Sequence, residues 1–68
     1  MKISAFVEKE NKIRVAALSA KSTVGNLLKE LNINPVTVIV SRNNEIVLED
    51  DELQDNDSLK IISVISGG

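Results

Sequence analysis

The segment Ser22–Ser41, STVGNLLKELNINPVTVIVS, changes its hydrophobic period part-way along and thereby decides the fold. Before Pro35, apolar residues recur at the i, i+3, i+4, i+7 spacing that places them on one face of a helix. After Pro35, a run rich in β-branched residues predicts a strand over Val36–Ser41. The residues of the helical face are Val24, Leu27, Leu28 and Leu31.

Local signals mark both ends of this helix. Ser22 and Thr23 are both suitable N-caps, because a hydroxyl oxygen accepts a hydrogen bond from a free amide of the first turn. Gly25 costs up to about 1 kcal/mol relative to alanine, so packing of the leucines has to hold the helix. Pro35 cannot continue a helix and disfavours a helical residue before it. We predict a helix over Val24–Leu31.

Period-2 alternation and turn residues predict four more strands outside this segment. The second of them breaks its own alternation, because Ile13 and Val15 share one parity and Leu18 has the other. This break suggests a bulge or an early strand end near Ala16. The predicted strands are Lys2–Val7, Lys12–Leu18, Glu45–Leu48 and Leu59–Ile65, with turns at Glu8–Asn11 and Asn43–Asn44.

The order strand, strand, helix, strand, strand, strand predicts an α+β fold in which one helix packs on a mixed five-stranded sheet. The first and last strands should pair in parallel, since the segment between them is long enough for a crossover. We expect one domain over residues 1–65 and a short flexible tail over residues 66–68. The helix should pack on Ile3, Val15, Val38, Val40, Leu59 and Ile61.

The composition excludes several classes of function. The chain has no Cys and no His, so it lacks a thiolate nucleophile, the commonest zinc ligand and the commonest general base. A net charge of -2 and a single aromatic residue leave no basic stripe and no base-stacking platform, so we expect no direct nucleic-acid binding. Its apolar runs are far shorter than the roughly 20 residues that cross a bilayer. We expect a cytoplasmic protein, monomeric when free, with no metal site.

The acidic residues are read as loop and turn residues. Asp55-Asn56-Asp57 lacks the central Gly and the late Glu of a calcium loop, so we predict a turn. The run Glu49–Glu52 leaves two interpretations open, a solvated loop or a surface that steers the protein toward a basic partner.

The chain ends in Ser66-Gly67-Gly68, directly after the last apolar strand. These residues have little to bury, and Gly has the most conformational freedom to lose, so we expect a mobile tail. Two glycines would let the backbone enter a narrow active site without Cβ clashes. The alternative is a terminus whose Gly-Gly sequence has no function.

Several short motifs together carry a family resemblance: Lys2-Ile3, Thr23-Val24, Leu27-Leu28, Asn43-Asn44-Glu45-Ile46-Val47, Asp55-Asn56-Asp57 and Val64-Ile65-Ser66-Gly67-Gly68. With the predicted fold, they resemble the β-grasp fold of ubiquitin and, more closely, the ThiS and MoaD sulfur carriers and the small archaeal ubiquitin-like modifiers. MoaD proteins often carry prolines shortly before the tail, whereas Leu59–Ile65 has none, so ThiS is the nearer comparison.

The resemblance implies a protein cosubstrate and not an enzyme. An adenylating partner enzyme would use ATP to activate the carboxylate of Gly68, and a sulfur donor enzyme would convert it to a thiocarboxylate. A synthase would then accept the sulfur for thiamin thiazole, molybdopterin or thiolated tRNA. The chain itself would bind no cofactor. Two alternatives remain open: a modifier conjugated to lysines through Gly68, and a non-reactive β-grasp interaction domain.

The predicted strands also offer a partner-binding surface. If Val38 and Ile61 face the helix, alternation turns Ile39, Ile62 and Val64 outward. By resemblance, Ile39 and Ile62 match the exposed apolar patch by which ubiquitin is recognised. An exposed apolar cluster beside a reactive tail suits enzyme docking. Phe6 has the outward parity on the first strand and either extends this patch or belongs to the core.

Overall fold

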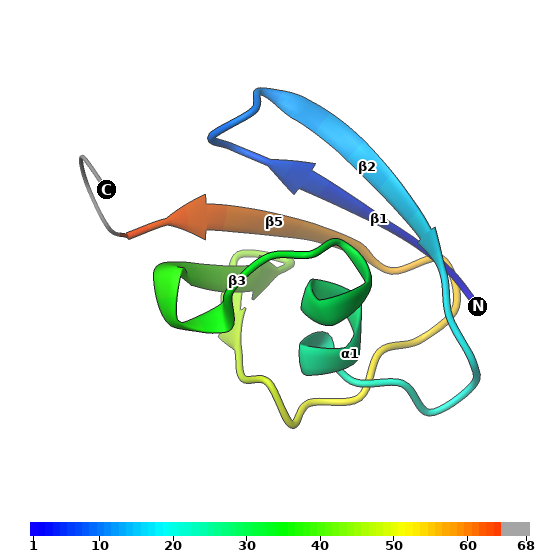
Figure 1. The fold of residues 1–68 in the computed structure, drawn as a ribbon. Coiled ribbons are helices and arrows are strands. Elements are labelled where there is room, and N and C mark those ends of the chain that lie inside the picture. Colours follow the sequence, from blue (N-terminus) through cyan, green and yellow to red (C-terminus); the bar gives the residue numbers. More distant parts are fainter. Residues whose placement is uncertain (65–68) are drawn as a thin grey trace.

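A mixed five-stranded sheet carries one helix on one of its faces in the computed structural model, which describes residues 1–64 (Figure 1). The strand order is β2-β1-β5-β3-β4, so β5 is the central strand. It pairs in parallel with β1 and antiparallel with β3, which confirms the predicted crossover. The elements are β1 (Lys2–Val7), β2 (Lys12–Ala17), α1 (Val24–Glu30), the 3-10 helix η1 (Pro35–Thr37), β3 (Val38–Arg42), β4 (Glu45–Val47) and β5 (Ser58–Ser63).

Thr23 is the N-cap of α1, which settles the choice between Ser22 and Thr23. Its hydroxyl oxygen accepts a hydrogen bond from the amide of Asn26 at 3.3 Å. In return, the Asn26 side-chain oxygen accepts one from the amide of Thr23 at 2.9 Å. This reciprocal capping box satisfies two backbone donors that a helix start leaves free.

The acidic connection between β4 and β5 completes the start of α1. The amide of Val24 donates to the carbonyl of Asp51, and the amide of Gly25 donates to the carbonyl of Glu49, both at 3.0 Å. The connection itself turns back through a 2.7 Å hydrogen bond from the amide of Leu48 to the Asp51 carboxylate. The run Glu49–Glu52 therefore has a structural role, whether or not it also steers a partner.

At its other end, α1 stops in a Schellman motif. Asn32 adopts the left-handed conformation with φ 61°, where Asn is tolerated better than most residues. The amide of Ile33 then donates to the carbonyl of Leu28 at 2.8 Å, and that of Asn32 to the carbonyl of Lys29 at 3.1 Å. This geometry returns Ile33 to the edge of the core.

The predicted strand Val36–Ser41 starts later than expected. Pro35–Thr37 forms η1, because the Asn34 side chain accepts a 3.0 Å hydrogen bond from the amide of Val36 and Pro suits a first helical position. The strand begins at Val38. The turn at Asn43–Asn44 is confirmed, and both residues have positive φ, the geometry that a two-residue hairpin loop favours.

The core contains the helix leucines and four of the six predicted sheet residues, and a fifth packs against it. Ile3, Val40, Leu59 and Ile61 are buried, and Val38 packs against them half-buried. Val15 was predicted to join them, and this is wrong: its side chain is 57% exposed, whereas the neighbouring Ala16 is buried.

The physical reason is the register of the first hairpin. Val7 pairs with Lys12 and Ile3 with Ala16, with no bulge between them. Because Ile3 and Val7 face the helix, their partners face it too, and Val15 points to the opposite side. The bulge suggested near Ala16 is therefore absent, and the alternative, an early strand end, is observed, since β2 ends at Ala17 and not at Leu18.

The Asp55-Asn56-Asp57 turn is confirmed. The Asp57 carboxylate accepts hydrogen bonds from Arg42 Nη1 at 3.0 Å and from the amide of Gln54 at 2.9 Å. The Asp55 carboxylate accepts one from the amide of Lys2 at 2.9 Å. Both carboxylates thus serve the turn and its attachment to the sheet.

Candidate docking surface

Ile39 and Ile62 lie directly opposite each other on β3 and β5, on the face of the sheet that α1 does not cover. Ile39 is 38% exposed and Ile62 is half-buried. Val64, just beyond β5, is 50% exposed. The structure therefore brings together the three residues that the alternation turned outward, while their binding to a partner stays a prediction.

Phe6 lies on the same outer face. Its neighbours in β1, Ala5 and Val7, are buried against the helix, so alternation directs Phe6 away from it. Its side chain is half-buried and is not part of the core. Of the two interpretations, the outer position is the one that the structure supports.

Two exposed isoleucines extend this face beyond the predicted residues. Ile13, opposite Phe6 on β2, is 64% exposed, and Ile46, opposite Ser41 on β4, is 67% exposed. Ile13 was missed because it shares its parity with Val15, which was assigned to the core. The short turn could have placed Ile13 outside, because it pairs Val7 with Lys12. Lys12 then lies on the helix-facing side with Val7, and Ile13, the next residue, lies on the other side.

Lys60 lies on the outer face between two groups of apolar side chains. One group is Phe6 with Ile13, and the other is Ile39 with Ile62. The backbone of Lys60 pairs with Phe6 on one side and with Ser41 on the other. Its ammonium forms an ion pair with Glu8 at 3.6 Å, and both side chains are half exposed. Exposed pairs of this kind contribute at most about 1 kcal/mol, so Lys60 marks a boundary more than it stabilises the fold.

The predicted reactive tail, Ser66, Gly67 and Gly68, lies outside the described residues, and the expectations placed on it stay predictions. The chain leading to it is anchored: the amide of Val64 donates to the carbonyl of Thr37 at 3.0 Å. In Figure 1, β5 runs toward the side of the molecule opposite the N-terminus.

Residues 1–64 contain no group of three or more acidic side chains placed to hold a metal ion. Over the same residues, no helix is long and apolar enough to cross a membrane.

Solved structures with this architecture define the class of the fold as β-grasp, ubiquitin-like. SAMP1 from Haloferax volcanii superposes with a TM-score of 0.78 at 17% identity, over 100% of both chains. The thiamine biosynthesis protein ThiS from Geobacter metallireducens gives a TM-score of 0.68 at 19% identity, again over 100% of both chains. At these identities the likeness concerns the fold alone.

The sequence places the chain within this class. The profile of the ThiS family matches residues 5–68. The chain therefore belongs to the ThiS family. It is also similar to the sulfur carrier protein TtuB from Thermus thermophilus, with 43% identity over 42 residues; the match spans 62% of this chain and 65% of that relative's length.

Proposed function

We propose that this protein is a sulfur carrier whose C-terminal Gly68 carboxylate is activated by a partner enzyme and converted to a thiocarboxylate. The observation that carries the proposal is the match to the ThiS family, which extends over residues 5–68 and so includes Gly67-Gly68. The similarity to a sulfur carrier, TtuB, supports it. The protein acts as a cosubstrate, and the catalytic groups belong to its partners.

The chemistry has two steps. A Gly68 carboxylate oxygen attacks the α-phosphorus of ATP, pyrophosphate leaves, and an acyl-adenylate forms. A sulfur nucleophile at the oxidation level of sulfide then attacks the acyl carbon and displaces AMP, so that a C–S bond replaces a C–O bond. Gly at the last position leaves the acyl carbon accessible, because no Cβ crowds it.

The fold suits this role because the chain leaves the sheet at the end of its central strand, from which the tail continues. The core residues Leu59 and Ile61 fix β5 within the sheet, and β5 pairs with a neighbour on each side. A partner that binds the domain therefore holds the end of β5 and Val64 in a defined position. Rigid placement of a reacting group is a large part of enzymatic rate acceleration.

Intact-mass spectrometry of the protein purified from its native host is the test. We expect a fraction of the chains to carry sulfur in place of one oxygen at the C-terminus, and a chain lacking Gly68 to carry none. Thiamin thiazole is the first acceptor to test, with molybdopterin and tRNA as the alternatives. A protein found only as an amide-linked conjugate on lysines would show that it is a modifier instead.

Ile39→Asp is expected to weaken binding to the adenylating enzyme about tenfold or more while the fold is kept, because a carboxylate in an apolar interface loses its hydration. Ile62→Asp should act in the same direction. The measurement is affinity for the adenylating enzyme of the same organism, by titration calorimetry. Val15→Asp, on the edge strand β2 and separated from β3 by β1 and β5, is the matched control. Equal affinity for Ile39→Asp and Val15→Asp would remove Ile39 from the docking surface.

A further inference from the structure

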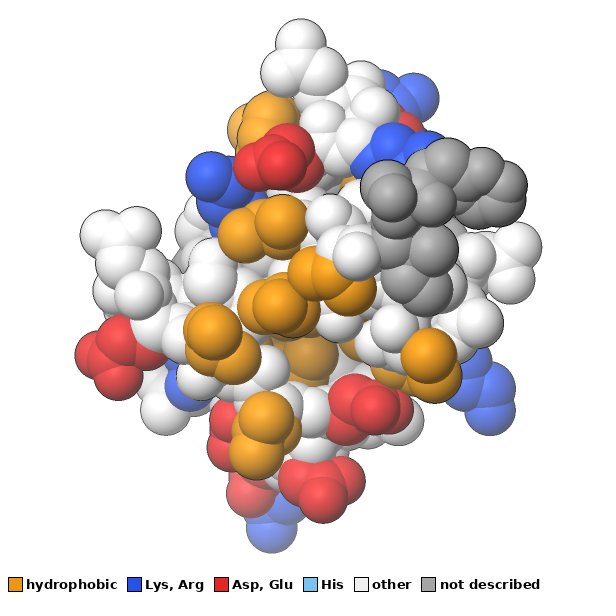
Figure 2. Space-filling view, turned by 90° about the vertical axis from the view of Figure 1, so that its left-hand side faces the viewer, with side chains coloured by type: hydrophobic (Ala, Val, Ile, Leu, Met, Phe, Trp, Pro, Cys, Tyr) orange, Lys and Arg blue, Asp and Glu red, His pale blue; other side chains and the backbone are white. Residues whose placement is uncertain are grey.

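A groove opens at the end of the molecule where β5 finishes. It lies between the β1–β2 turn, the segment after α1, the start of β3 and the end of β5, and has a volume of about 980 Å³. The buried side chains of Val7 and Ile61 form its floor, and the half-buried Ile33 and Val38 form a wall. Figure 2 shows apolar side chains gathered at the centre of this side of the molecule, with charged side chains around them.

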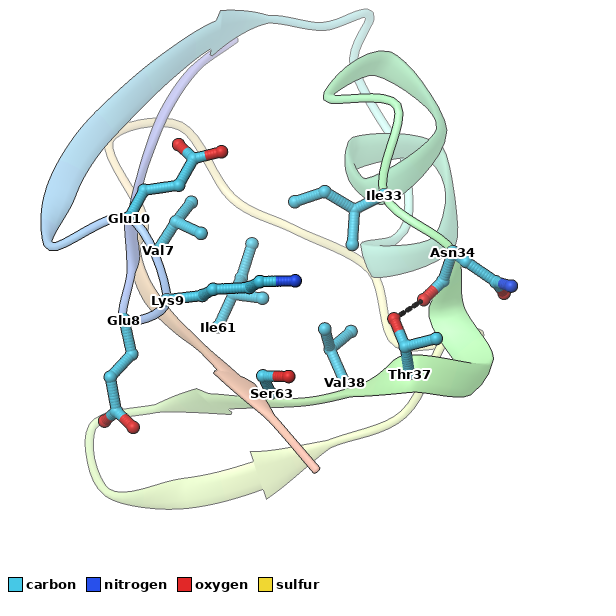
Figure 3. Close-up of a pocket in the computed structure, with 10 residues that line it drawn as sticks. All are labelled: Val7, Glu8, Lys9, Glu10, Ile33, Asn34, Thr37, Val38, Ile61 and Ser63. Carbon is cyan, nitrogen blue, oxygen red and sulfur yellow. Dashed lines mark hydrogen bonds between the residues drawn. The ribbon is translucent and has the colours of Figure 1, made fainter. Parts of the chain in front are cut away.

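Lys9 projects over this apolar floor. In Figure 3 its side chain extends from the β1–β2 turn into the groove, while that of Glu8 points away from it. The carboxylates on either side of Lys9 are already paired: Glu8 with Lys60 at 3.6 Å and Glu10 with Arg14 at 3.7 Å. Among residues 1–64, by contrast, no carboxylate forms an ion pair with Lys9. The groove thus combines an apolar floor with a cation, Lys9, that has no ion-pair partner within residues 1–64.

The position of the groove determines what can cover it. Ser63, the last residue of β5, lines it, and Gly68, the proposed acyl donor, is four residues beyond the anchored Val64. Four residues span at most about 14 Å. Any enzyme that binds the Gly68 carboxylate must therefore approach within that distance of Val64, and its surface must face this end of the domain.

We propose that the groove is a second docking site for the adenylating enzyme, which inserts an apolar side chain between Val38 and Val7 and pairs a neighbouring carboxylate with Lys9. This inference rests on the proposed function, and it adds a contact that the outer face of the sheet does not supply. The apolar floor favours the inserted side chain through burial, and Lys9 favours a carboxylate through charge complementarity. A second copy of this chain is a poorer occupant, because two such ends in contact would bring two Lys9 ammonium groups together.

Lys9→Glu is the direct test. We expect it to raise the KM for the carrier about tenfold or more in ATP–pyrophosphate exchange by the adenylating enzyme of the same organism, with kcat within about twofold of the parent. Reversing the charge replaces attraction by repulsion at an exposed turn, so the fold is kept. Lys21→Glu makes the same change of net charge in the loop between β2 and α1, on the other side of the molecule (Figure 1), and should leave KM unchanged. Equal KM values for the two variants would overturn the proposal.

Val38→Thr tests the apolar part of the site. It keeps the shape of the side chain and places a hydroxyl in the groove, so KM should rise several-fold, whereas Val15→Thr on the exposed edge strand should not change it. Unchanged KM for Val38→Thr would show that no apolar side chain enters the groove.

The two proposals fail in different ways. If the parent protein supports no exchange at all, the proposed function fails. If the parent supports exchange, requires Gly68 and tolerates both Lys9→Glu and Val38→Thr, the sulfur-carrier proposal stands and the groove proposal alone is wrong.

Discussion

Deletion of Gly68 is expected to abolish ATP-dependent adenylation and to leave the melting temperature of the protein unchanged. A terminal glycine has no side chain to bury, so the core should not respond to its loss. The new terminal carboxylate, in contrast, would stop about one residue, up to roughly 3.5 Å, short of the α-phosphate of ATP. Misplacement by that distance removes the in-line approach on which the reaction depends. ATP–pyrophosphate exchange and a thermal melt measure the two effects on one sample.

Two further variants separate the effect of tail length from the effect of the last residue's side chain. Deletion of Ser66 shortens the tail by the same length but keeps the Gly-Gly ending, so it should fail as the Gly68 deletion does. Gly68→Ala keeps the length but adds a Cβ beside the acyl carbon, and should slow adenylation through crowding. If the chain ending at Gly67 is adenylated as fast as the full chain, Gly68 is not the acyl donor and the proposed function is wrong.

The centre of the fold could be predicted from sequence because two independent signals agree there. The leucine spacing before Pro35 and the β-branched run after it define a helix and a strand that the structure contains. The strand start was placed two residues early, because the capping of Val36 by the Asn34 side chain competes with extended backbone. Such local side-chain hydrogen bonds are not visible in a hydrophobic pattern.

The alternation of β2 alone could not predict which of its residues lie on the helix side of the sheet. Ile13 and Val15 form a pattern as regular as that of a core strand, yet pairing with β1 puts them on the outer face. An edge strand can show such residues to solvent, because its inner face needs only Ala16 to fill the space under the helix. The register of the β1–β2 pairing, which depends on the turn between the two strands, determines on which face Val15 lies.

The groove lay beyond sequence reasoning for a different reason. Val7, Ile33, Val38 and Ile61 come from four segments of the chain, and each was assigned to the core or left without a role. Only the tertiary arrangement shows that part of this apolar surface opens to solvent beside the end of β5. A site made from the ends of several elements has no pattern within any one of them.

Ile61→Ala is expected to lower the free energy of unfolding by about 2 to 5 kcal/mol. Ile61 is 1% exposed, and its backbone pairs with Val7 on one side and Val40 on the other, so the truncation leaves a cavity at the centre of the sheet. Small domains have total stabilities of about 5 to 15 kcal/mol, so this loss is a large share. Leu28→Ala, which truncates a helix side chain of the same core at 2% exposure, should cost a similar amount. Urea denaturation followed by circular dichroism measures both.

Val15→Ala is the control that gives this prediction its meaning. Val15 resembles Ile61 in sequence pattern, but it is 57% exposed, so its truncation should change the free energy of unfolding by no more than about 0.5 kcal/mol. A parent-like midpoint for Ile61→Ala would mean that β5 does not face α1 with this side chain. A loss at Val15 as large as that at Ile61 would instead mean that β2 turns its valine inward. Because one residue of slippage exchanges the two faces of a strand, the pair of measurements distinguishes the observed register from the one that alternation alone predicts.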